Sequence, residues 1–301
     1  MSQSNKLQVL YRTFQKYPLE EIGLNAYALA DAAQDKRFLK ALKNARKKCL
    51  LKEASGEKAK EISPHLIQLP HEFDSRDWAW IEKNIAGGSA MTIIITPLNF
   101  EFLYAHLRHF IEVEFDGGLE MILAFWDPLV LATLLGNPKD ETLYVQGPVC
   151  NQAQFERLMS PIQSWWYWDR LGNIQAIFGL NERVDALPQI ESPLHFDVEQ
   201  EEMMVEATFP DHLIYYLKLN NGFLVDHIDD YTLYQFVVES IPEARAYLLS
   251  GTRDILNFIC LKLIYKENFA IDTKLQAVLE KVKNKDMTMD QAMSQLVSKA
   301  G

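Results

Sequence analysis

The segment Ala90-Met91-Thr92-Ile93-Ile94-Ile95 is the basis of the fold that we expect for the first half of the chain. It is short, apolar and rich in β-branched residues, which is typical of a strand buried on both faces of a sheet. Gly87-Gly88 ends a predicted helix before it. Thr96-Pro97 opens a predicted helix after it, which reaches about Phe110. A buried sheet covered by helices is therefore expected.

Further strands and turns extend this pattern in both directions along the chain. Asn25–Ala30 and His65–Leu69 are predicted to be strands. Ile111–Phe115 alternates strictly between apolar and acidic residues, and Asp116-Gly117-Gly118 turns the chain into a returning strand, so these residues predict a β-hairpin. Asp127-Pro128 combines an N-cap with proline at the first helical turn, which predicts a helix ending at Gly136.

The composition of the sequence changes after about residue 180. Residues 181–206 hold Pro188, Pro193 and eight carboxylates against one arginine, so we place a domain boundary between residues 190 and 191. The prediction is an α+β fold: a mixed lobe with a central sheet over residues 1–190, then a smaller all-helical lobe over residues 191–301. Two apolar stripes and a Thr288–Gln291 capping box support helices near the end. The stripes are Leu275, Val278, Leu279 and Val282, then Met289, Met293, Leu296 and Val297.

Composition narrows the class of protein. The 301 residues carry a net charge of −11, and the three cysteines are far apart without a CxxC spacing, which indicates neither a disulfide framework nor a zinc ribbon. The first twenty residues lack a signal-peptide core, and no window approaches 18 uncharged apolar residues. We therefore expect a soluble, cytoplasmic protein that does not insert into a membrane.

The charge is unevenly distributed. The first 60 residues carry 13 basic and 6 acidic side chains, whereas the remaining 241 carry 17 and 35. Four lysines in the first 60 residues recur at helical spacing, and they predict either a solvated helix face or a docking surface for an acidic partner. They are Lys36, Lys40, Lys43 and Lys47. A nucleic-acid-binding regulator would use the same helix, but the acidic bulk argues against nucleic acid.

Few side chains suggest catalysis. His106 and His109 lie three residues apart on one predicted helix, but a metal site needs a third ligand that this spacing does not supply. Asp31 and Asp127 each follow an apolar strand, where they would serve either as an acid–base pair or as acceptors for backbone N–H groups. The first alternative is a hydrolase-like enzyme. We expect the structural role, with no catalytic residue, cofactor or metal.

The aromatic cluster Trp165-Trp166-Tyr167-Trp168 is the densest in the chain. Such rings either pack in a core or anchor a partner at an interface. We count Trp165, Trp166 and Trp168 as candidate partner contacts. Met289 and Met293 join them, because methionines suit adaptable binding surfaces.

Several of these stretches, taken in order, resemble the effector-chaperone or adaptor family of bacterial type VI secretion systems (the Tap, or TEC, proteins). The segments that carry the resemblance span roughly residues 24–170, and their family-motif residues are Tyr27, Asp31, Gln34, Asp35, Trp126, Asp127, Pro128, Gly147 and Pro148. Ala32 and Ala124 depart from the family pattern, which often has glycine and usually arginine there.

The resemblance implies a non-enzymatic adaptor that binds a toxic effector in the producing cell and delivers it to the VgrG spike. Because the family motifs lie in the first lobe, we expect that lobe to contact the spike. The helical lobe matches no family motif, so we expect it to contact the cargo. Its two stripes either both pack on the core of the lobe itself, which is the alternative we favour, or one of them, the terminal helix before the other, is the exposed cargo surface.

Overall fold

The structure is a computed structural model that describes residues 6–14, 19–51, 56–179 and 193–297. The chain forms two compact units, Met1–Ala207 and Thr208–Gly301. The predicted boundary between residues 190 and 191 lies outside the described residues. Leu194–Phe196, just beyond it, is a strand of the first unit.

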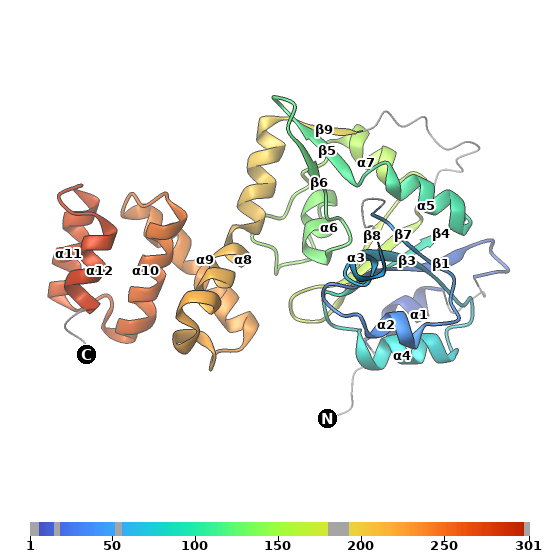
Figure 1. The fold of residues 1–301 in the computed structure, drawn as a ribbon, viewed down its shortest axis with the longest axis horizontal. Coiled ribbons are helices and arrows are strands. Elements are labelled where there is room, and N and C mark those ends of the chain that lie inside the picture. The colour runs from blue at the N-terminus through green and yellow to red at the C-terminus, as the bar shows by residue number, and fades with distance from the viewer. Residues whose placement is uncertain (1–5, 15–18, 52–55, 180–192, 298–301) are drawn as a thin grey trace. The chain divides into compact units, whose positions relative to one another are not determined.

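The first unit is built on a six-stranded sheet in the order β2-β3-β1-β4-β7-β8, and every neighbouring pair is antiparallel. Figure 1 shows this sheet between two layers of helices. The predicted strands at residues 25–30, 65–69 and 90–95 are confirmed as β1, β3 and β4. The strands of this sheet are β1 Asn25–Asp31, β2 Lys47–Cys49, β3 Pro64–Leu69, β4 Met91–Thr96, β7 Ser164–Trp168 and β8 Ile174–Phe178.

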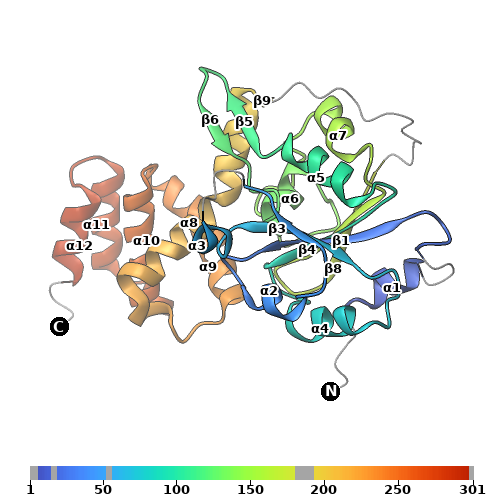
Figure 2. The same cartoon turned by 45° about the vertical axis from the view of Figure 1, so that its right-hand side comes forward.

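Both faces of this sheet are buried, because successive side chains of a strand point to opposite faces. On one face Tyr27, Ile94 and Trp165 pack in a core with α5, α6 and α7. On the other face Ile93 and Trp166 pack in a core with α1, α2 and α4 (Figure 2). The helices of this unit are α1 Gln8–Phe14, α2 Arg37–Ala41, α3 Glu57–Lys60, α4 Arg76–Asn84, α5 Phe100–Arg108, α6 Pro128–Leu135 and α7 Gln152–Met159.

The predicted hairpin belongs to a second, three-stranded sheet in the order β6-β5-β9. Strand β5 (Glu112–Phe115) pairs antiparallel with β6 (Glu120–Ile122) and parallel with β9 (Leu194–Phe196). Gly117 and Gly118 in the turn have φ of +97° and +81°. Such values favour glycine, because a side chain crowds the backbone there.

Helix α8 (Val198–Val225) begins in the first unit and continues into the second. The second unit is all-helical, which confirms the α+β class with a helical C-terminal segment. The apolar residues of the first predicted stripe, on α11, are all buried. No described helix is both long and apolar enough to span a membrane. The other elements are α9 Asp230–Ala246, α10 Thr252–Tyr265, the 3-10 helix η1 Lys266–Asn268, α11 Thr273–Lys283 and α12 Met289–Val297.

Of two predicted helix starts, the structure contradicts one and confirms the other. Helix α5 begins after Asn99, whose side chain accepts from the Phe102 N–H at 3.1 Å, so the expected helix start at Thr96-Pro97 is wrong. Thr96 is instead the last residue of β4, and its hydroxyl accepts from the Leu98 N–H. The capping box at α12 is confirmed, because Thr288 and Gln291 each accept from the backbone N–H of the other.

Candidate partner-binding site

The first motif of the chain closes a turn at the end of β1. The Asp31 carboxylate accepts from the Ala33 N–H at 2.9 Å and from the Gln34 side chain at 3.4 Å. Asp35 accepts from the Arg37 backbone and guanidinium, and this guanidinium lowers the pKa of the Asp35 carboxyl. Tyr27 donates its hydroxyl to the Leu98 carbonyl at 2.9 Å. Each of these polar groups therefore has a partner in the fold.

Two later motifs bracket a single helix, α6. At its start, Asp127 accepts from the Leu129 N–H at 2.9 Å, and Pro128 fills the first turn. At its end, the N–H groups of Val149 and Cys150 donate to the carbonyls of Thr133 and Leu134 at 3.1 and 2.9 Å. The residues after Gly147-Pro148 thus satisfy carbonyls that the helix end leaves without intrahelical partners.

Gly147 is required at the second of these motifs for a steric reason. Its φ is +72°, and a Cβ at this position would lie 2.1 Å from the Thr133 carbonyl oxygen. Residue 147 therefore has no room for a side chain. The Gly-Pro motif holds this segment close against the end of α6.

The two carboxylates considered for catalysis both accept from backbone amides, as described above. The two histidines do not form a shared site. His106 is buried, its Nε2 bonds the Leu158 carbonyl at 2.8 Å, and burial lowers its pKa to about 4. His109 is exposed. Among the described residues, no group of three or more His, Cys, Asp or Glu side chains is placed to hold a metal ion.

The predicted lysine face does not form. Helix α2 ends at Ala41, and Lys47 lies in strand β2, so the four lysines do not share one helix. Lys47 donates to the Leu39 and Leu42 carbonyls at 3.3 and 2.9 Å, and burial lowers its pKa. The helix stops early because residues 47–49 pair with β3. Lys36, Lys40 and Lys43 are exposed.

The tryptophans proposed as partner contacts belong to the core. Trp165, Trp166 and Trp168 are buried in β7, with Trp165 on one face of the sheet and the other two on the opposite face. The structure therefore corrects the expectation of an exposed aromatic patch. Met289 is also buried, and Met293 is half-buried. The terminal helix accordingly packs on its own unit and does not present a free methionine face.

A groove does form at the start of α8, and a buried pair of amides fixes its position. Gln200 donates to the Val149 carbonyl at 2.7 Å and to Gln154 Oε1 at 2.6 Å. Gln154 in turn donates to the His195 carbonyl at 2.7 Å. The pair thereby ties the first turn of α8 to α7, to β9 and to the segment after Pro148.

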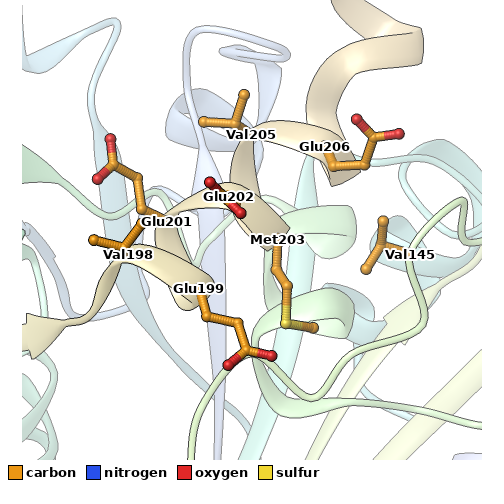
Figure 3. Close-up of a pocket in the computed structure, with 8 residues that line it drawn as sticks. All are labelled: Val145, Val198, Glu199, Glu201, Glu202, Met203, Val205 and Glu206. Carbon is orange, nitrogen blue, oxygen red and sulfur yellow. The ribbon is translucent and has the colours of Figure 1, made fainter. Parts of the chain in front are cut away.

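The groove has a volume of about 680 Å³ and combines carboxylates with apolar side chains. Figure 3 shows Met203 pointing into the space between Glu199 and Val145. Tyr144 donates its hydroxyl to Glu206 at 2.8 Å at one side. We call this feature the acidic groove; its lining residues are Val145, Val198, Glu199, Glu201, Glu202, Met203, Val205 and Glu206. Its chemistry suits a partner segment that carries both basic and apolar side chains.

A second exposed surface lies in the helical unit. Tyr215 and Leu219 lie four residues apart on α8, and Phe223 follows beyond Asn221, whose backbone is not helical (φ −137°, ψ 36°). More than half of each of the three side chains is exposed. Leu213 and Leu217, on the opposite side of the helix, are fully buried. We call the three exposed residues the apolar stripe. Large apolar side chains exposed near one another in the sequence are a common feature of protein-binding surfaces.

Sequence reasoning missed both surfaces, although each has a signal. The carboxylate-rich residues 197–206 belong to the stretch whose composition predicts a domain boundary. The four-residue spacing of the apolar stripe is visible in the sequence, but its periodicity does not distinguish a buried helix face from an exposed one. Burial of the neighbouring Leu213 and Leu217 decides that question.

Comparison with known proteins gives one match. The family model described as "Domain of unknown function (DUF4123)" matches residues 26–143, from β1 to just beyond α6. Neither the curated proteins nor the solved structures contain a match to this chain. Gly147-Pro148 lies beyond the matched segment, so the resemblance seen there stays a prediction. Residues 26–143 are similar to the DUF4123 family, which is associated with the effector adaptors of type VI secretion.

Proposed function

We propose that the chain is a non-enzymatic adaptor that binds a type VI secretion effector and loads it onto the VgrG spike. The observation that carries this proposal is the family match over residues 26–143. The motif residues agree with a structural role, because Asp31 and Asp127 hold backbone N–H groups at the start of a turn and of a helix.

The two exposed surfaces suggest how the partners are divided. The acidic groove lies in the first unit, next to the fold that carries the family motifs, so we assign it to the spike. The apolar stripe lies in the helical unit, and we assign it to the cargo. An apolar stripe contributes by burying apolar segments of the cargo, while charge in the groove sets the register and rate of association.

Affinity purification from a cell with an active type VI system tests the proposal. The tagged full chain is expected to recover both an effector and VgrG. The variant Glu199→Lys/Glu202→Lys should lose the spike and keep the cargo, and Leu219→Asp/Phe223→Asp should do the reverse. Glu61→Lys and Ile271→Asp alter exposed residues outside both surfaces and should recover both partners.

Recovery of neither partner class by the unaltered chain would contradict the adaptor function. If the groove variant loses the cargo and the stripe variant loses the spike, the two surfaces have been assigned to the wrong partners. A hydrolytic activity of the purified chain that disappears in a folded Asp31→Asn variant would establish the enzyme alternative instead.

A further inference from the structure

The outer edge of the β5–β6 hairpin carries an unusual combination of groups. Within the described residues, β6 pairs with β5 only, so one edge of this strand is open. Leu119, Met121 and Ile122 are 58%, 52% and 55% exposed. Figure 2 shows the tip of this hairpin projecting away from the central sheet.

The direction of the backbone groups follows from two hydrogen bonds. The Phe115 N–H donates to the Leu119 carbonyl at 2.9 Å, and the Leu123 N–H donates to the Ile111 carbonyl at 2.7 Å. Bonded and non-bonded pairs alternate along an antiparallel ladder. Glu114–Glu120 and Glu112–Ile122 are therefore the non-bonded pairs. The N–H and C=O groups of Glu120 and Ile122 consequently point away from β5, toward the open edge.

One face of this small sheet is apolar across all three strands. Val113 pairs with Leu194 on one side and with Met121 on the other, so the three side chains share a face. Val113 and Leu194 are buried in the core, whereas Met121 is half exposed. The apolar face of this sheet therefore extends from its buried part, at Val113 and Leu194, to the exposed Met121 on the open edge strand.

The opposite face carries like charges in close register. Glu114 and Glu120 lie directly across from each other in a non-bonded pair, the arrangement in which cross-strand side chains are closest. Glu112 is on the same face of β5. Like charges directly opposite each other destabilise a strand pair, and a neighbouring cation relieves the repulsion.

From these three features we propose that β6 is a strand-addition site for an extended segment of another protein that alternates apolar with basic residues. The backbone groups of Glu120 and Ile122 pair with the added strand. Its apolar side chains extend the face of Met121 and Leu119, and its lysines or arginines lie beside the glutamates. A second copy of this chain is a poorer occupant, because pairing β6 with itself brings its glutamates together.

The probe is an acetylated and amidated ten-residue peptide in which lysine alternates with valine and threonine, labelled for fluorescence anisotropy and titrated with the full chain. Glu120→Lys should weaken binding about tenfold or more, while raising the melting temperature because the repulsion with Glu114 is removed. Ile122→Pro removes an outward N–H without a change in charge and should also weaken binding. Ile122→Thr keeps that N–H and is the matched control.

Hydrogen exchange supplies a second readout. Bound peptide is expected to slow exchange at the amides of Glu120 and Ile122, which a purely electrostatic association with an acidic protein would not do.

Equal binding by Ile122→Pro and Ile122→Thr would overturn the proposal. Loss of binding in Glu199→Lys/Glu202→Lys but not in Glu120→Lys would also overturn it, because the peptide would then occupy the acidic groove. Dimers of the free chain that Ile122→Pro abolishes would show that β6 pairs with a second copy instead.

This inference does not rest on the proposed function. Peptide binding at β6 can fail while an effector and VgrG are still recovered from cells. It can also succeed when neither is recovered. The two sets of experiments therefore have distinguishable failures.

Discussion

Asp127, which follows a turn in the structure, shows how a single carboxylate becomes a structural element. It could have been an acid or base, but its Oδ1 accepts from the Leu129 N–H at the start of α6. A free backbone N–H at a helix start needs such an acceptor. The carboxylate therefore stabilises the start of α6, a helix whose own side chains are mostly buried in the core.

Replacing Asp127 with alanine is expected to lower stability by about 1 kcal/mol, because loss of an N-cap costs roughly 0.5–2 kcal/mol. Denaturant unfolding of the full chain measures the change. Asp127→Asn keeps an oxygen acceptor and is the control, with a smaller loss. A variant Asp127→Ala that unfolds like the unaltered chain yet fails to recover its partners would place this residue in a binding site.

We expect His106 to make the fold sensitive to acid. Its imidazole is buried against the Phe110 ring, with 5.1 Å between the ring centroids, and Nδ1 has no hydrogen-bond partner in the described residues. Burial, followed by repulsion from His109, lowers the pKa to about 4, although the bond to the Leu158 carbonyl opposes the shift. The unfolded chain takes up this proton near pH 6.5 and the folded chain only near pH 4.

Stability should therefore fall as the pH drops from 6.5 to 4, because the unfolded state binds one more proton in that window. A depression of this size corresponds to about 3 kcal/mol. His106→Gln keeps a donor for Leu158 and does not titrate, so its unfolding free energy should decline less steeply over that range. His109→Gln alters an exposed side chain and should retain the steep decline. Equal slopes for the chain and for His106→Gln would contradict the assignment.

At the scale of elements, the fold depends on connections between segments that are distant in sequence. Strand β7 pairs with β4, about 70 residues earlier, and its residues divide between two cores. The hydrogen bond between the Gln154 and Gln200 side chains likewise connects two segments that are distant in sequence, α7 and α8. Such links fix the start of α8 and with it the lining of the acidic groove.

Removing either glutamine should therefore destabilise the first unit. Gln154→Ala and Gln200→Ala each leave a buried amide or carbonyl without its partner, which costs about 1–3 kcal/mol. The double variant should lose less than the sum, with a coupling of about 0.5–3 kcal/mol in a double-mutant cycle followed by urea unfolding. Gln152→Ala, whose bond to Glu156 is exposed, is the control. Strict additivity would show that the two amides act independently.

At the scale of the whole molecule, each unit has its own hydrophobic core and its own exposed surface. The first unit carries the family match, the acidic groove and the open edge of β6. The second carries the apolar stripe. Its terminal helix α12 packs against α10 and α11. We therefore propose the contact surface of the helical unit on α8, because the terminal helix packs on its own unit.

Truncation after Asp286 should destabilise the helical unit, because it removes Met289, Ala292 and Leu296 from the core. Burial of each large apolar side chain contributes about 1.5–3 kcal/mol. Thermal unfolding followed by circular dichroism, with hydrogen exchange on α10 and α11, measures the effect. Leu296→Ala in the full chain should reproduce part of it. A truncated chain that melts normally and loses its cargo would restore α12 as the cargo surface.

Features that depend on contacts within a few residues could be predicted from the sequence. The hairpin at Asp116-Gly117-Gly118, the cap at Asp127, the capping box at Thr288 and the stripe on α11 are all confirmed. Turn chemistry, capping and helical periodicity act over two to about seven residues, so their signals lie in the local sequence. The α+β class follows from their order along the chain.

Which faces of the helices and strands are buried became clear from the three-dimensional structure alone. Lys47 lies in a strand because Lys47–Cys49 pairs with β3, which overrides the helical spacing of the lysines. The tryptophans of β7 are core residues because helices cover both faces of the sheet. The apolar stripe and the edge of β6 are surfaces because nothing in the described part of the chain covers them. Burial depends on residues far apart in sequence, and no local pattern specifies which of two apolar faces finds a partner.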